Sequence, residues 1–469
     1  MRPTFSLVVL GALVLIGATR STAAAGEYYP SEVEMRGTTR TTWPLADLRA
    51  RGYDIPELTR SENAAWTYLD AINAFEDLPE GLSPAFDEAL KGDWPSGANG
   101  KELRRWLLQA GNQRAIALAR EASRIADCQF PYFGNAGGSL IHVLLPNLSD
   151  YRMLAKLTVV DGRRLVQENQ PGQALEGYEA VFRMGDHVAR GITLIEGLVG
   201  IACSALADNA MRDLAVHPQV TAPVLKELLR RTAGLADLRP SVRRGTGLER
   251  RFCHAMVDDI AARPTAMLAN LQAIDGGFLD TASGPPPATG WGALEARIGR
   301  LVFPDRTIKA HMDRYFDELT RRAQLPAHEA RWEDGWDERL FQSLPQWDLL
   351  TRMLVPSLTR ASIFDDRLCT QCRMTRIAAA LRLYADQHGG RAPDSLEAVT
   401  GLLGDADVLT DPFSGTAFAY RPAGEGWILY SFAENCVDDD GRESERAWKL
   451  DYVCRYPPAA SDTGADATD

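Results

Sequence analysis

The pair of residues whose spacing is typical of redox chemistry is Cys369 and Cys372, in the motif Cys-Thr-Gln-Cys. In thiol oxidoreductases such a pair lies at the start of a helix that follows a strand, where the helix dipole lowers the pKa of the first thiol. Here the surrounding sequence predicts the interior of a helix. We therefore favour a structural disulfide or two buried thiols, and exchange activity is the alternative.

A second chemical feature is the carboxylate-rich segment 433–441, which contains Glu434 and the aspartates 438–440 before Gly441. Oxygen-rich loops with a glycine suit a hard cation, which takes about six to eight oxygen ligands. Cys436 and Cys454 flank the aspartates, and a disulfide between them would contribute roughly 3 kcal/mol in the chain-entropy model and make a metal unnecessary. A solvated turn is the third interpretation. Seven cysteines leave at least one thiol unpaired.

Other catalytic signatures are missing from the sequence. It has no H-E-x-x-H, no G-x-S-x-G, no phosphate-binding glycine loop and no dinucleotide fingerprint, and its seven histidines show no metal-ligand spacing. The net charge of -12 argues against binding to nucleic acid or to anionic lipid surfaces. The hydrophobic content of 45% is that of an ordinary globular protein.

The elements that carry these residues follow from periodicity. Apolar residues at spacings of three and four predict a helix with one buried face, ending at a Gly-Gly pair: Met374, Ile377, Leu381, Tyr384, Gly389 and Gly390. A turn at 411–415 (Asp-Pro-Phe-Ser-Gly) then leads into strands predicted at Thr416–Arg421, Trp427–Phe432 and Tyr452–Tyr456. The segment 368–456 therefore predicts a long helix packed on a small antiparallel sheet.

The same segment resembles a known family. The order of helix, Gly389-Gly390-Arg391-Ala392-Pro393, the Asp-Pro turn, Tyr430-Ser431 and the aspartates before Gly441 resembles the periplasmic half of the major pseudopilin of type II secretion systems. In that family the acidic loop binds calcium. The resemblance thus implies a pseudopilin-like fold and points to calcium as a cofactor, with three aspartates as metal ligands: Asp438, Asp440 and Asp451.

The amino-terminal half extends the resemblance. The residues 62–65, 128–131 and 193–202 resemble those of uncharacterised secreted bacterial proteins, which pair a helical region with the same pseudopilin-like tail. The resemblance implies an architecture for most of the mature chain. It implies no activity.

The chain begins with a secretory signal. An apolar run, Leu7–Ala18, precedes small residues at Ala23–Ala25, and the run is too short for a good membrane span. We expect a cleavable signal peptide (1–25) and a soluble extracytoplasmic product, in the periplasm or secreted, with no transmembrane span in the mature chain. If the signal stays uncleaved, it would anchor the protein instead.

The domain organisation follows from helical periodicity and from linkers. We expect an irregular lead-in at Glu27–Pro56, a helical array within 26–275, a linker at 276–292, a helical connector at 293–367, the pseudopilin-like domain at 368–456 and a disordered acidic tail at 457–469. Helices are predicted after Ser61, at Lys101–Ala126, Leu148–Gln167, Pro171–Ala189, Ile192–Leu214, Ala222–Ala236, Gly247–Ala262 and Thr307–Ala323. Short breaks between them favour antiparallel neighbours, as in bundles and solenoids.

Two patterns have simple structural explanations. The segment 190–196 imitates a prepilin cleavage motif, but it is internal and charged residues follow it, so we interpret it as part of a core helix. The tryptophans 332, 336 and 347 suggest a ligand platform, although aromatic residues on helices usually fill cores, and we favour the core.

These patterns together predict a mainly α protein, in which a helical hairpin or solenoid-like array precedes a carboxy-terminal α+β domain. The function that we favour is a non-enzymatic extracytoplasmic structural or protein-interaction module that has protein partners in the cell envelope and is associated with secretion machinery. A genuine type II secretion or pilus-like component and a thiol oxidoreductase using Cys369 and Cys372 are the alternatives.

Overall fold

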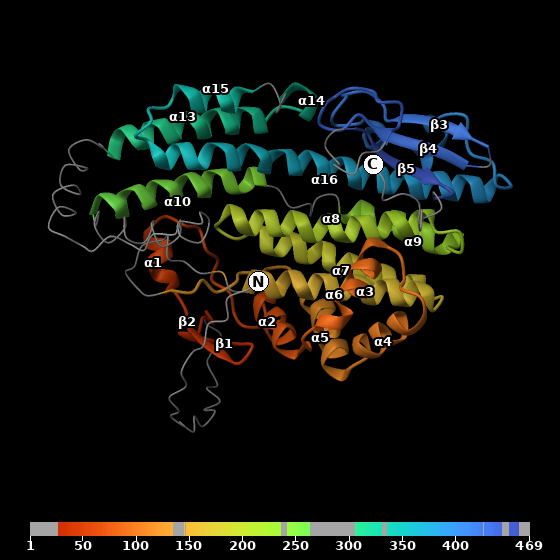
Figure 1. The fold of residues 1–469 in the computed structure, drawn as a ribbon, viewed down its shortest axis with the longest axis horizontal. Helices are drawn as coiled ribbons and strands as arrows, with labels where there is room; N and C mark the ends of the chain where they lie inside the picture. Colours follow the sequence, from red (N-terminus) through yellow and green to blue (C-terminus); the bar gives the residue numbers. More distant parts are fainter. Residues whose placement is uncertain are drawn as a thin grey trace.

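The computed structural model describes residues 27–134, 145, 147–235, 242–262, 305–330, 335–424, 426–442 and 450–458. The chain is mainly helical, with a small antiparallel sheet near its carboxy terminus, as the sequence predicts (Figure 1). The predicted signal peptide (1–25) and linker (276–292) lie outside the described residues, as does the tail from residue 459.

The amino-terminal lead-in is not irregular, so this prediction was wrong. Strands β1 (Glu32–Met35) and β2 (Thr38–Thr41) form an antiparallel hairpin, and helix α1 (Leu45–Ala50) follows. The turn is made by Arg36 and Gly37, both at positive φ. Strands of four residues are too short for alternation to be visible in the sequence.

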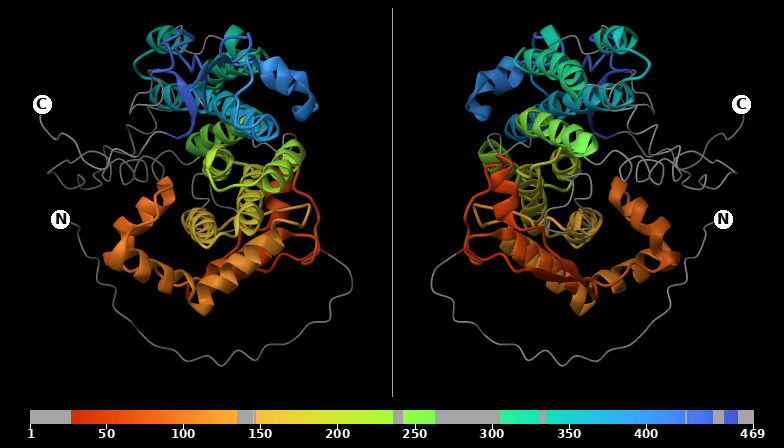
Figure 2. Two further views of the ribbon diagram at one scale, coloured as in Figure 1. Left: turned by 90° about the vertical axis from the view of Figure 1, so that its right-hand side faces the viewer. Right: turned by 90° about the vertical axis from the view of Figure 1, so that its left-hand side faces the viewer.

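Four helices form an arc around the long helix α6 (Asn147–Gln167) (Figure 2). They are α2 (Ala64–Ala74), α3 (Ser83–Lys91), α4 (Gly97–Leu107) and α5 (Ala110–Ala122). The single helix predicted at Lys101–Ala126 is therefore two helices, which break at Gln109.

Packing against α2 explains this break. A Cβ at Gly111 would lie 2.6 Å from the backbone oxygen of Ala74, so α5 begins where its backbone touches the end of α2. The buried Asn112 amide donates to the Trp106 carbonyl at 2.7 Å, and its oxygen accepts from the Glu76 N–H at 2.9 Å. Tertiary contacts therefore end α4, and no local helix-breaking residue is needed.

The helices that follow match the predicted ranges closely. Helix α7 spans Pro171–Ala189, as predicted, and α8 (Leu194–Val216), α9 (Ala222–Leu235) and α10 (Val242–Ala262) have ends within a few residues of the prediction. The break before α7 has a local cause, because Asn169 adopts a left-handed conformation (φ 59°) and proline occupies the first helical position.

Helix α8 is long and apolar enough to cross a membrane by length and composition, the one such helix in the described part of the chain. However, 67% of its most apolar window is buried inside the fold. The segment that imitates a prepilin motif is the start of this core helix. Thr193 caps it, and Glu196 completes a capping box.

The connector forms a second hydrophobic core with α10. Its helices are α13 (Asp305–Ala323), α14 (Ala327–Ala330) and α15 (Trp336–Ser343). Trp336 is buried and stacks on Tyr315 with ring centroids 5.5 Å apart, so the core interpretation is confirmed for this tryptophan. Trp347 is half-buried, and Trp332 lies outside the described residues.

Helix α16 (Leu349–Gln387) is the predicted long helix and contains Cys369 and Cys372. It lies lengthwise through the molecule (Figure 1), with the sheet and α13–α15 on one side and α8 and α9 on the other. The residues 377–381 are fully buried. Arg376 and Arg382 are also buried, with exposed fractions of 8% and 3%. A single buried face was expected, whereas residues 374–383 are covered on every side of the helix.

The sheet has the strand order β3-β4-β5, with both pairs antiparallel: β3 (Ala419–Ala423), β4 (Gly426–Ser431) and β5 (Tyr452–Tyr456). The predicted Asp-Pro turn is fixed by Asp411, whose carboxylate accepts from Phe413 N–H at 3.1 Å and from Ser431 Oγ at 2.8 Å. Gly415 has φ 70°, as a turn ending in glycine requires.

One hydrophobic core spans the predicted domains. It includes residues of α2–α9, the second half of α16, the turn at Phe413 and the strands β4 and β5. The helical array and the carboxy-terminal segment therefore fold around a common interior.

Helices α7 and α8 approach each other closely at Gly185 and Gly200. A Cβ at Gly200 would lie 2.4 Å from the Gly185 oxygen, and backbone cannot move aside as a flexible side chain can. We expect Gly200→Ala to lower the free energy of unfolding by about 1–3 kcal/mol, as overpacked core sites do. Urea denaturation would measure it. Gly234→Ala on α9 is the control, because no atom lies within 4 Å of its Cβ; an equal loss in both variants would contradict this packing.

Glu196 gives the fold a pH dependence. It is buried, and burial raises its pKa from 4.5 to about 7 although Thr193 and Tyr132 donate hydrogen bonds to it. Below pH 4.5 the carboxyl is mainly protonated in both the folded and the unfolded chain, so its burial does not lower the stability by desolvating a charge. As the pH rises to 7, the unfolded chain ionises first, so stability is lost.

We therefore expect the free energy of unfolding of the wild type to fall relative to Glu196→Gln between pH 4.5 and pH 7, by up to about 3 kcal/mol. Denaturant titrations across this range would measure it. The exposed Glu102→Gln is the control and should differ from the wild type by a constant amount. A constant difference for Glu196→Gln as well would show that the pKa of Glu196 is not raised.

Candidate functional site

A cavity of about 220 Å³ lies where α16 meets the helical array. We call it the seam cavity. Its lining comes from α7, α8, α9, α16 and the short 3-10 turn Ala406–Leu409 with its cap: Phe182, Asp208, Met211, Thr232, Leu235, Cys372, Arg373, Arg376, Asp405 and Val408.

Asp208 is the buried carboxylate of this cavity, with 1% of its surface exposed. Thr375 Oγ1 donates to its Oδ2 at 3.0 Å and Arg212 at 3.3 Å, and the Cys372 thiol also donates to it. Burial raises the pKa of Asp208 to about 6 against these donors and the Arg212 charge. Asp208 thus joins α8 to α16 through hydrogen bonds beside the cavity.

The Cys-Thr-Gln-Cys motif lies inside α16, as predicted. The helix begins at Leu349, about five turns before Cys369, so the start of the helix is too far away to activate a thiol. None of the seven cysteines forms a disulfide in the structure. Cys372 lines the seam cavity, whereas Cys369 does not.

Two guanidinium groups on α16 line the cavity from the side of the carboxy-terminal segment. Arg373 donates to the Thr410 carbonyl, and Arg376 donates to the Leu403 carbonyl at 2.8 Å. Neither forms an ion pair with a carboxylate among the described residues, and the buried Nε of Arg376 has no hydrogen-bond partner there. Burial lowers the pKa of Arg376.

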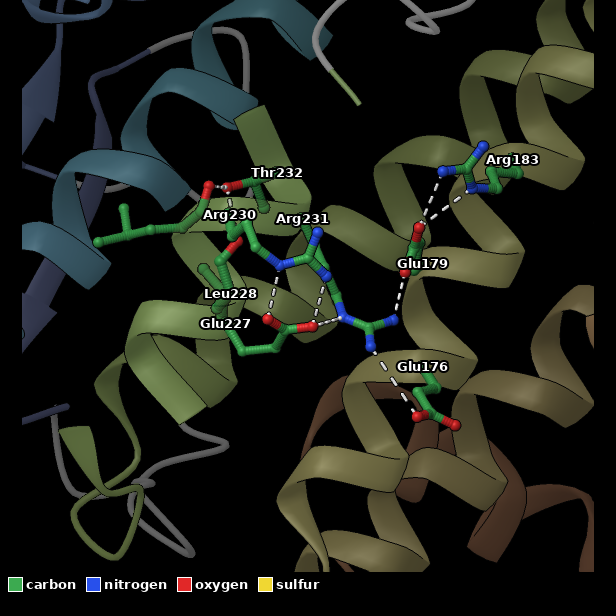
Figure 3. Close-up of polar contacts among 9 residues, drawn as sticks. Glu176, Glu179, Arg183, Glu227, Leu228, Arg230, Arg231 and Thr232 are labelled. Carbon is green, nitrogen blue, oxygen red and sulfur yellow. Dashed lines mark hydrogen bonds and ion pairs between the residues drawn. The ribbon is translucent and has the colours of Figure 1, made fainter. Parts of the chain in front are cut away.

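The wall formed by α9 is held in place by ion pairs with α7 (Figure 3). Arg231 bridges Glu227 of its own helix and Glu179 of α7, and Glu179 also pairs with Arg183 at 2.9 Å. The network positions Thr232, whose hydroxyl donates to the Leu228 carbonyl at 2.8 Å. Thr232 therefore offers the cavity its methyl group and an acceptor oxygen.

The acidic loop folds around Asp451. Its Oδ2 accepts from the N–H groups of Asp439 at 3.2 Å and Gly441 at 2.7 Å, while the Asp438 carboxylate accepts from the Asp440 N–H at 2.9 Å. Asp451 is 4% exposed, and its Oδ1 has no partner among the described residues.

These contacts do not by themselves form the calcium site that the resemblance implies. No three histidine, cysteine or carboxylate side chains within the described ranges form a group that could hold a metal ion. Arg421 donates a hydrogen bond to the Asp440 carbonyl at 3.1 Å, and Arg455 donates one to the Gly441 carbonyl at 2.8 Å. Both loop carbonyls are therefore already hydrogen-bonded. The orphaned Asp451 oxygen is the observation in favour of a cation, and calcium stays a prediction.

The predicted disulfide between Cys436 and Cys454 is not formed in the structure. Cys436 is exposed and lies at positive φ in the loop, whereas Cys454 is buried in β5 opposite Leu429. Spacing in the sequence placed them on either side of the loop, but it does not reveal which face of β5 carries Cys454.

The residues that make the seam cavity were not predicted from the sequence. The single buried face predicted for the helix leaves out Arg373 and Arg376, and Asp208 is one of the charged residues that follow the prepilin-like motif. A carboxylate in the apolar stretch Leu194–Val216 was the available signal, since a buried charge needs donors from neighbouring elements.

Comparison with family models, with curated proteins and with solved structures finds no match to this chain. The pseudopilin resemblance is therefore a prediction from the sequence motifs.

The calcium prediction is tested by isothermal titration of the mature chain with Ca²⁺. Saturable heat that is lost in Asp451→Asn is the result that the resemblance predicts, because an amide removes the charge at the orphaned oxygen. Asp407→Asn, at an exposed position of the 3-10 turn, is the control and should bind like the wild type. No heat in any of the three proteins would contradict the prediction.

Proposed function

We propose that this protein is a non-enzymatic interaction module of the extracytoplasmic space, in which the helical array and the carboxy-terminal domain act as one body. The observation that carries the proposal is helix α16, which packs on α8 and α9 and also underlies the sheet. Surfaces of both parts are thereby held at a fixed relative position, which an adaptor between partners requires.

The carboxy-terminal geometry supports a pseudopilin-like fold for residues 368–456. The second half of α16 lies under a three-stranded antiparallel sheet. Two motifs of the resemblance meet there, since Asp411 of the Asp-Pro turn accepts a hydrogen bond from Ser431 at the end of β4. A partner in a secretion system is the interaction that this likeness favours.

A genuine secretion or pilus-like component is the first alternative. In a prepilin the helix before the sheet is apolar, continuous with the amino terminus and inserted in the membrane. Here α16 is preceded by α15 and packs on it and on α13. This arrangement favours an adaptor over a polymerising subunit.

A thiol oxidoreductase is the second alternative. Cys372 donates to the buried Asp208, and both cysteines of the motif lie in mid-helix, an arrangement that favours a structural role for these thiols. Catalysis of insulin reduction by the mature chain, lost in Cys372→Ser, is the result that would support the enzyme.

The location follows from the predicted signal peptide at residues 1–25, which we propose directs the chain out of the cytoplasm.

The interaction role is tested by a photoreactive amino acid placed in the full-length chain at either of two exposed alanines. Ala423 lies on β3 of the sheet, and Ala233 lies on α9 of the helical array. We expect discrete crosslinks to an envelope protein from position 423, because β3 is an edge strand of the sheet and offers an edge for docking.

The position of the crosslinks distinguishes recognition by the sheet from recognition by the helices. Crosslinks to secretion-system proteins at 423 support the adaptor, and crosslinks at 233 alone would move recognition to the helices. The absence of crosslinks at both positions would contradict an interaction role. Full-length protein is needed, because removing residues from 368 onward would cut α16 in its middle and expose the common core.

A further inference from the structure

The seam cavity has a charge pattern that the fold itself does not complete. Arg376 is 8% exposed, and no carboxylate among the described residues lies within ion-pairing distance of it or of Arg373. Buried charges in proteins are nearly always paired, because taking a charge out of water without a partner is costly. Asp405, which is exposed, acts on Arg376 through its charge and forms no ion pair with it, so a directly bound anionic partner is missing among the described residues.

The two arginines are arranged to act together. They lie three residues apart on α16, so both side chains leave the same face of the helix. Each uses one nitrogen on a backbone carbonyl, and a guanidinium carries five N–H donors in all. Donors therefore remain for a group with two acceptor oxygens.

The carboxylates at the cavity limit the charge of that group. Asp208 already has three donors from the protein, and it places a titratable negative charge in the lining. Asp405 is exposed and caps the adjacent turn. A doubly charged phosphate would meet repulsion from both, whereas a single negative charge matches the arginines better.

Apart from Thr232 and Cys372, the remaining lining is apolar, and it comes from four elements: Phe182, Met211, Leu235 and Val408. A volume of about 220 Å³ corresponds to roughly seven water molecules at ~30 Å³ each. The space therefore suits a small molecule with an apolar part and one charged end. Ligand sites in proteins commonly combine an apolar lining with a few polar groups in this way.

We propose that the seam cavity is a binding site for a small apolar carboxylate, held by Arg373 and Arg376. The carboxylate comes either from a free organic acid or from the carboxy terminus of a peptide, since the two share this chemistry. The site is separate from the interaction surfaces proposed above and does not depend on them.

The test reads the reactivity of Cys372, which lines the cavity, in the full mature chain. Benzoate is the probe and benzamide its neutral isostere, and alkylation by iodoacetamide is mapped to each cysteine by mass spectrometry. We expect benzoate to slow alkylation of Cys372 about tenfold at roughly ten times its dissociation constant. Cys369, three residues earlier on α16, is the internal control and should keep its rate.

Two variants show whether the arginines are responsible. Arg373→Gln and Arg376→Gln should each abolish protection by benzoate, while Arg421→Gln on β3 should retain it. Arg373 is half-buried, so its variant carries the test even if the Arg376 variant does not fold. Equal alkylation with benzoate, with benzamide and without ligand in the folded wild type would overturn the proposal, as would protection that persists in both cavity variants.

The source of the carboxylate is resolved with a short peptide that ends in phenylalanine, compared with its amidated form. Protection by the free acid and not by the amide would assign the site to a peptide terminus. Protection by benzoate alone would assign it to a free acid. Inorganic phosphate should protect less than benzoate, and stronger protection by phosphate would contradict the inferred single charge.

Discussion

The fold depends on helix α16 being buried on all sides over residues 374–383. Five consecutive residues, 377–381, have no exposed surface, so neighbours cover every face of the helix there. One side meets α8 and α9 and the other meets the sheet. A helix in that position cannot belong to one domain alone. Losing either neighbour would expose apolar surface, which costs about 25 cal/mol of free energy per Å².

Polar contacts fix how α16 lies in this interior. Asp208 of α8 accepts from Thr375, and the Arg382 guanidinium donates to the His217 carbonyl and lies 4.0 Å from the Tyr456 ring centroid. Buried polar groups tolerate little displacement, since each lost partner costs about 1–3 kcal/mol. Asp208 also lines the seam cavity, together with Arg373 and Arg376 of α16.

The sequence predicts the local elements well and the assembly poorly. Helix α7 and strand β5 have the predicted bounds. Asn169, in a left-handed conformation, and Pro171 mark the start of α7, and alternating side chains mark β5. The break between α4 and α5 had no local signal, since it results from the contact of Gly111 with α2. The cavity residues were invisible for the same reason: they lie between positions 182 and 408 and meet only through packing. An arginine on a predicted helix is normally interpreted as solvent-exposed, and only the structure shows that Arg376 and Arg382 are covered.

The central claim is that the helical array and the sheet domain share one cooperative core through α16. Native-state hydrogen exchange measures this directly, because amides of one cooperative unit exchange through the same unfolding event. The account predicts that the amides of residues 377–381 in α16 and those in the middle of α8 exchange with the same free energy, equal to that of global unfolding. Exchange of α16 together with β4 at a distinctly lower free energy than α8 would contradict it, since the carboxy-terminal domain would then open independently.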